Sequence, residues 1–128
     1  MNAVDPHLPN PAPINANGNG GFRFAGMSHR GSLLCLPNGI WASPVSSASE
    51  IDETVLTAAL NPAAPDAAVD HFLIGTGRDL LAMPAPLREA FRARRIVLES
   101  MSTGAAVRTY NILLGERRRI GALLVAVD

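Results

Sequence analysis

The feature that most constrains this 128-residue chain is the alternation of apolar runs and helical stretches in its second half. Buried strands are predicted at 69–74, 96–98 and 120–127, because each is short, apolar and bounded by turn residues. Helices are predicted between them, one starting around 84–86 and one starting at Ala105. A strand–helix–strand–helix–strand order is typical of an α/β sheet covered on both faces. The sequence therefore predicts the α/β class.

The two predicted helices are amphipathic. The first places Leu87, Ala90 and Phe91 toward the core, and its opposite side carries a row of arginines, Arg88, Arg92 and Arg95. The second presents Val107, Tyr110 and Leu114 on one face. Both helices therefore have one face to bury against the sheet.

The first half of the chain predicts shorter elements. Residues 22–24 alternate apolar and charged side chains, and two apolar runs, 32–36 and 40–42, flank the turn Pro37-Asn38-Gly39. Asn-Gly between apolar runs is a strong hairpin signal, so we expect one compact antiparallel unit over 21–45. A helix with Asp52 as its cap should follow and stop at Asn61-Pro62.

The first thirteen residues contain four prolines and no periodic pattern. We expect 1–13 to be a disordered tail and 14–128 to form a single α/β domain, because 48% hydrophobic content suffices for one core. No signal peptide, transit peptide or membrane span is readable, so the expected location is cytoplasmic, without direct membrane insertion.

Charge and reactive residues exclude several functions. The net charge is zero, although residues 1–87 carry three Arg against seven acidic residues and 88–128 carry eight against four. The chain has no Lys, so neither a Schiff-base nor a P-loop lysine exists. Exclusive use of Arg also suggests a bacterial source. With 5% aromatic residues, no nucleic-acid partner is expected.

The remaining reactive residues are few. The single Cys35 lies in an apolar run, which favours a buried, unreactive thiol over a nucleophile. His71 lies within a predicted strand and is more typical of a core or edge side chain than of a base. Because no His or acidic residues have metal-ligand spacing, we expect no metal and no cofactor.

Three blocks of sequence carry a family resemblance. The first, 20–39, contains Gly-Gly-Phe-Arg-Phe-Ala-Gly, His-Arg-Gly-Ser-Leu-Leu and Pro-Asn-Gly, and the second, 73–77, is Leu-Ile-Gly-Thr-Gly. The third, 103–119, contains Thr-Gly-Ala-Ala-Val-Arg-Thr-Tyr-Asn-Ile-Leu-Leu and ends in three arginines. Over about residues 18–128 the chain resembles the mitochondrial complex I assembly factor 3 family, also called domain of unknown function 498. The resemblance implies a three-layer fold with a central mixed β-sheet, helices on its faces and an additional N-terminal β-hairpin layer. The mitochondrial relative helps to assemble respiratory complex I, whereas bacterial and archaeal relatives have no agreed activity.

The best candidate site is a pair of loops that follow predicted strands. They are Gly75-Thr76-Gly77 and Ser102-Thr103-Gly104. If the strands are parallel, both loops lie at the carboxyl edge of the sheet, where open α/β folds form crevices. Thr103 could cap the next helix and leave its amides free for an anion. The structural alternative is a pair of tight strand-to-helix turns.

Arg108 would lie near the start of its helix, where the helix dipole disfavours a cation. A structural ion pair with Glu99 is the favoured explanation, and a bound anionic ligand is the alternative. Asn111, one turn further on, shares the face of Arg108 and could orient either partner. The ligand-binding candidates are Gly75, Thr76, Gly77, Glu99, Thr103, Arg108 and Asn111.

Two functional hypotheses follow. The first is a non-catalytic accessory protein that binds an unidentified protein partner in the assembly of respiratory complex I or another membrane complex. The resemblance and the scarcity of acid–base groups favour it. The second is an enzyme or small-molecule binder that holds an anion in the carboxyl-edge crevice. The three arginines at 117–119 are explained by their place at a helix C-terminus.

Overall fold

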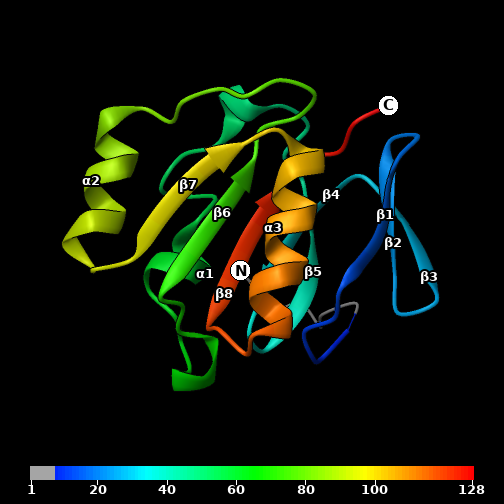
Figure 1. Ribbon diagram of the computed structural model, residues 1–128. Helices are drawn as coiled ribbons and strands as arrows, with labels where there is room; N and C mark the ends of the chain where they lie inside the picture. Colours follow the sequence, from blue (N-terminus) through cyan, green and yellow to red (C-terminus); the bar gives the residue numbers. More distant parts are fainter. Residues whose placement is uncertain (1–7) are drawn as a thin grey trace.

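The computed structural model describes residues 8–128 and contains a five-stranded sheet in the order β5-β4-β8-β6-β7 (Figure 1). Its strands are β4 (Ser32–Leu36), β5 (Gly39–Ser43), β6 (His71–Gly75), β7 (Val97–Met101) and β8 (Ile120–Leu124). Strand β6 pairs in parallel with both β7 and β8, and β4 pairs antiparallel with β5 and β8. The mixed sheet and the α/β class are confirmed.

A second, three-stranded antiparallel sheet stands beside the first and consists of β1 (Ile14–Gly18), β2 (Gly21–Phe24) and β3 (Met27–Arg30). The expected single unit over 21–45 is therefore wrong, because the chain changes sheets between β3 and β4. Burial gives the reason. Strand β4 is apolar on both faces and pairs with the central β8, whereas β3 is mostly exposed. The Asn38-Gly39 hairpin itself is confirmed between β4 and β5.

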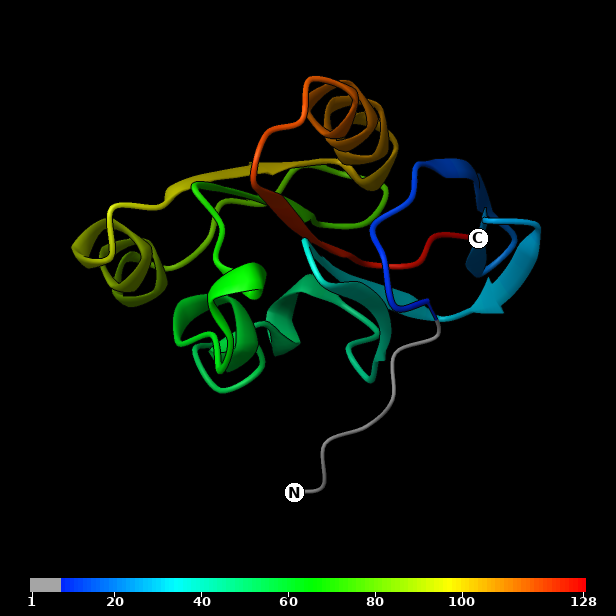
Figure 2. The ribbon, with the colours of Figure 1, turned by 90° about the horizontal axis from the view of Figure 1, so that it is seen from below.

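Helices cover both faces of the five-stranded sheet (Figure 2). They are α1 (Thr57–Leu60), α2 (Ala85–Ala93) and α3 (Thr103–Gly115), with short 3-10 turns η1 (Ala48–Glu50) and η2 (Pro65–Ala67). Helix α3 and the three-stranded sheet lie on one face, and α1 and α2 lie on the other. The helix expected from Asp52 is shorter than predicted: Asp52 accepts a hydrogen bond from Val55 N in a turn, and α1 has only four residues.

Two apolar cores lie on opposite faces of the sheet. On β6, Phe72 and Ile74 point toward α1 and α2, and Leu73 points toward α3. The alternation follows from the two-residue period of a strand. The predicted core faces hold for α2, where Leu87 and Phe91 are buried, and for α3, where Val107 and Tyr110 are buried.

Part of the predicted tail contacts the domain. Leu8 forms an isolated antiparallel bridge with Ile40 of the edge strand β5, with Ile40 N 2.9 Å from Leu8 O. Leu8 and Ala12 also pack against the core under α3. Residues 8–13 therefore make more contacts than a disordered tail would, and the rest of that tail, 1–7, lies outside the described residues.

Candidate functional site

Strands β6 and β7 are parallel, so the two predicted loops do lie at the same edge of the sheet. Gly75, at the end of β6, packs directly against the first residue of α3. A Cβ on Gly75 would lie 2.9 Å from Thr103 Cα and 3.0 Å from Thr103 Oγ1. Glycine at this position therefore lets the helix approach the strand closely, which is a packing role.

Thr103 holds the two loops together. Its hydroxyl accepts a hydrogen bond from Gly77 N at 2.9 Å and donates one to Val125 O at 2.7 Å, and the side chain is fully buried. The expectation that Thr103 caps the helix is wrong. Ser102 is the cap, with its Oγ accepting from Ala105 N at 3.4 Å, and α3 already begins at residue 103.

Thr76 is likewise turned inward. Its hydroxyl accepts from Leu81 N at 3.1 Å, and its single proton can be donated to Asp79 O at 2.5 Å or to Met101 O at 3.1 Å. Both threonine hydroxyls are thus occupied by backbone partners. These contacts support the structural alternative of tight turns, and ligand binding by Gly75, Thr76, Gly77 and Thr103 stays a prediction.

Glu99 is paired with a different residue than expected. Its Oε1 lies 2.5 Å from Nε2 of His71 on the neighbouring strand β6. Glu99 is aligned with Leu73, and His71 lies two residues before Leu73, so both side chains are on the same face of the sheet. Arg108 is exposed and makes no ion pair with any described residue. The predicted Glu99–Arg108 pair is therefore wrong. Because α3 begins at 103, Arg108 lies in its second turn, where the opposing dipole effect has largely decayed.

Asn111 explains why Arg108 and Glu99 lie apart. The Asn111 amide donates to Ile14 O and accepts from Ile14 N, each at 2.8 Å. That flank of α3 therefore faces β1, and Arg108, three residues earlier, shares it. Glu99 lies on β7, across the other flank of the helix (Figure 1). The seven candidate residues therefore do not surround one crevice.

A groove of about 510 Å³ does open at the carboxyl edge of the sheet. Strands β5, β6 and β8 run in the same direction, and the segments that follow them line this groove. Thr76 and Gly77 belong to its wall, beside hydroxyls of residues 46, 47 and 49. Arg78 is the only cation among the described residues that line it. The groove lies at the predicted edge of the sheet, and of the seven candidate residues only Thr76 and Gly77 are among the described residues that line it.

A second groove of about 430 Å³ lies between α2 and β7. It is lined by Arg88, Arg92, Arg95, Ile96, Val97 and Leu98. Strand β7 is the last strand of the sheet, and within residues 8–128 no strand pairs with its outer edge. The helical periodicity predicted that the arginines face solvent, but only the fold places them beside an open strand edge.

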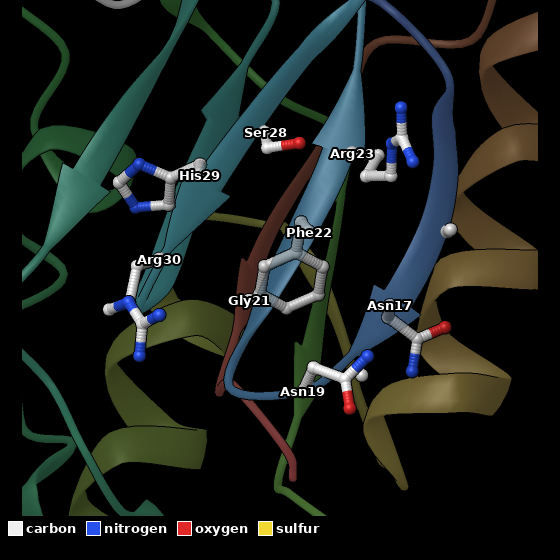
Figure 3. Close-up of a pocket in the computed structure, with 10 residues that line it drawn as sticks. Asn17, Asn19, Gly21, Phe22, Arg23, Ser28, His29 and Arg30 are labelled. Carbon is white, nitrogen blue, oxygen red and sulfur yellow. The ribbon is translucent and has the colours of Figure 1, made fainter.

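A third hollow, of about 520 Å³, lies on the three-stranded sheet (Figure 3). We call it the N-terminal hollow, and it is lined by Ala16, Asn17, Gly18, Asn19, Gly21, Phe22, Arg23, Ser28, His29 and Arg30. Sequence reasoning missed it. A signal was present, because the chain has no acidic residue from position 6 to position 49 while Arg23 and Arg30 lie in that stretch.

Metal binding, membrane crossing by a helix and cysteine reactivity have little support in the described part of the chain. Within residues 8–128, no three His, Cys, Asp or Glu side chains gather in a way that could hold a metal ion, and no helix is long and apolar enough to cross a membrane. Cys35 is fully buried, as predicted. Burial raises the pKa of its thiol to about 12, and the Tyr110 hydroxyl opposes this only in part.

The fold and these surfaces define a small α/β protein whose mixed sheet is enclosed by helices and by an N-terminal antiparallel sheet. The chain belongs to the family described as protein of unknown function (DUF498/DUF598), whose model matches residues 14–125. This confirms the family indicated by the three sequence blocks.

Relatives support the same assignment. An uncharacterized protein of Rhodobacter capsulatus is 38% identical over 121 residues, which are 94% of this chain and 90% of the relative. A solved structure from Bartonella henselae, described as an outer membrane protein, is 47% identical with a TM-score of 0.86 and covers 95% of this chain and 100% of its own. A Bordetella pertussis protein described as a Mth938-like domain is 25% identical with a TM-score of 0.77, covering 98% and 91%.

Proposed function

We propose that this protein is a non-catalytic accessory protein that binds another protein along the outer edge of β7. One observation carries the proposal: within residues 8–128 the outer edge of β7 is unpaired, and it lies beside a row of three arginines. The family resemblance suggests the setting, which is the assembly of respiratory complex I or another membrane complex from the cytoplasmic side.

The backbone of β7 shows which groups a partner would meet. Val97 N donates to Asp70 O, and Met101 O accepts from Thr76 N, so Val97, Glu99 and Met101 direct their backbone groups toward the interior of the sheet. The alternate residues, Leu98 and Ser100, therefore present their N–H and C=O groups outward. These are the groups that an added strand pairs with.

Charge selects among the partners that could pair there. Arg88, Arg92 and Arg95 flank the edge, and Val97 is 55% exposed above it. A second copy of the chain would bring two arginine rows together, which Coulomb repulsion opposes. An extended segment with Asp or Glu side chains would instead gain attraction along its length. The groove therefore favours an acidic strand from another protein.

The test is a comparison of variants in affinity capture from a lysate of the source organism, quantified by mass spectrometry. Ser100→Pro removes one outward N–H without breaking a bond to β6, and Arg88→Glu with Arg92→Glu reverses the charge. Both variants should lose the same captured protein, whereas Arg23→Gln, a change on the other sheet, should retain it. Equal capture by all variants would contradict binding at β7.

The second candidate is an enzyme or small-molecule binder at the carboxyl-edge groove. The observation that favours it is the groove of about 510 Å³ at the place where open α/β sheets bind ligands. Its hydroxyls are largely engaged with neighbours: Ser46 donates to Glu50 at 2.9 Å, and Ser47 and Ser49 share a hydrogen bond. A ligand that raises the melting temperature of the wild type but not of Arg78→Gln would support this candidate.

A further inference from the structure

The pairing register of the three-stranded sheet places two arginines on one face. Gly18, Gly21 and Arg30 are aligned in one row across the strands, and Ala16, Arg23 and Ser28 are aligned in another. These rows lie two residues apart along β2 and β3, so their side chains point to the same side of the sheet. The other side is apolar, with Phe22 and Phe24 buried in the core.

Small residues create the space between the two guanidinium groups. Ala16, Gly18 and Gly21 leave the middle of this face almost free of side chains. Gly21 is required there, because a Cβ would collide with the carbonyl oxygen of His29. Figure 3 shows Arg23 and Arg30 on opposite sides of β2, with Asn17 and Asn19 at the hairpin end. The result is the N-terminal hollow, with arginines on two sides.

The electrostatics of the hollow are not balanced within the domain. Neither Arg23 nor Arg30 forms an ion pair or a side-chain hydrogen bond with another residue in 8–128. Among the described residues, no Asp or Glu lines the hollow. Asp128 Oδ1 lies 4.0 Å from the position of a Cβ on Gly20, but Asp128 lines the carboxyl-edge groove. Residues 8–128 therefore supply no paired counter-charge to the two like charges on this face.

We propose that the N-terminal hollow binds a phosphate-bearing small molecule. Guanidinium groups match the geometry of phosphate oxygens, and two of them can share one doubly charged group. The Ser28 hydroxyl and the Asn19 amide add neutral donors around it. The hollow, of about 520 Å³, has room for a ligand with an organic portion or a second phosphate beside the first. This site is independent of the β7 edge.

The experiment is a two-dimensional ¹⁵N–¹H NMR titration of the full chain at constant ionic strength. Inorganic pyrophosphate and glycerol 3-phosphate are the soluble probes, and phosphatidate in phosphatidylcholine vesicles is the lipid probe. The expected result is saturable shifts concentrated on the amides of residues 17–21. The stronger of the soluble and lipid responses then identifies the source of the phosphate group.

Variants decide whether the arginines are responsible. Arg23→Gln and Arg30→Gln should each weaken binding by about tenfold or more, because each removes one charged donor. Arg117→Gln, just after the end of α3, is the matched control and should leave the midpoint unchanged. Absence of binding by all three probes would overturn the proposal. So would shifts spread over all arginine-bearing surfaces, or binding that Arg23→Gln and Arg30→Gln leave intact.

Discussion

The five-stranded sheet is covered on both faces, whereas the three-stranded sheet is covered on only one. Every residue of β8 is buried, and most of β3 is exposed. Around the larger sheet, buried polar groups must find partners inside the protein, as Thr103 at the start of α3 does with Gly77 and Val125. In the smaller sheet, the outer face carries Arg23 and Arg30, whose side chains have no such partners among residues 8–128.

Because of this difference, residues around the larger sheet serve mainly stability, whereas the exposed face of the smaller sheet is available for binding. A residue enclosed on both sides is constrained by packing and hydrogen bonding, so it has little freedom to serve a ligand. An exposed face can carry charges at small cost to folding. The hydrogen bonds that tie the smaller sheet to the rest of the domain include those between Asn111 of α3 and Ile14, and the bond from Gly20 N to Val127 O at 2.7 Å. The four predictions that follow test this separation, starting with the largest expected effect.

Thr103→Val should destabilise the protein by about 2–4 kcal/mol. The substitution preserves shape but leaves Gly77 N–H and Val125 C=O buried without their hydroxyl partner, and each unsatisfied group costs about 1–3 kcal/mol. Urea unfolding measures the loss. Thr103→Ser keeps the hydroxyl and should recover most of the stability. A loss of the same size in both variants would show that packing, and not hydrogen bonding, holds the two loops together.

Asn111→Ala should cost about 1–3 kcal/mol, because both backbone groups of Ile14 lose their side-chain partner. The effect should be local. Hydrogen exchange should accelerate in β1, β2 and β3 more than in β6 and β8. Arg108→Ala is the matched control on the same flank of α3 and should change little. Uniform acceleration across both sheets would contradict the view that the smaller sheet can loosen alone.

Alkaline pH should destabilise the native state through Cys35. Burial raises the pKa of this thiol to about 12, so above its ordinary value the unfolded chain releases the proton that the folded chain retains. Stability should therefore fall as pH rises from about 9 toward 12, by up to about 1.4 kcal/mol per pH unit. Burial also raises the pKa of Tyr110, which adds to the loss. Urea unfolding between pH 8 and pH 10 measures the slope.

The control for this pH dependence is Cys35→Ala, which removes the buried thiol and should flatten the slope just above pH 9. The wild-type native thiol should also resist alkylation at pH 8 until the protein unfolds. An unchanged slope in Cys35→Ala would assign the alkaline loss to other groups.

Ala25→Asn should stabilise the protein by about 0.5–1 kcal/mol. Ala25 and Gly26 form the turn between β2 and β3 and have φ angles of 50° and 75°. Asn tolerates this left-handed conformation better than Ala, and Asn-Gly is the preferred pair in such turns. The shift of the urea midpoint measures the gain. Ala25→Val, with a β-branched side chain, should shift it in the opposite direction, and a gain in both would refute the turn assignment.

The same contrast explains which sites could be predicted. The crevice at the carboxyl edge was found because parallel strands end at a common edge wherever they form. The partner of Glu99 could not be predicted, because the sequence does not say which flank of α3 faces β7. Arg88, Arg92 and Arg95 were predicted to face solvent from helical spacing alone. Their position beside an open edge follows only from β7 being the last strand.

The sequence by itself determined the second-half strands and helices, the Asn38-Gly39 hairpin, the buried Cys35 and the family. Each of these depends on periodicity or turn chemistry within a few residues, or on motifs read directly. The tertiary structure decided that residues 21–45 divide between two sheets, that His71 pairs with Glu99, and that Asn111 binds Ile14 across 97 positions. Such contacts depend on the order of the strands and on which faces are buried. Both are determined only when segments that are distant in the sequence pack into the same core.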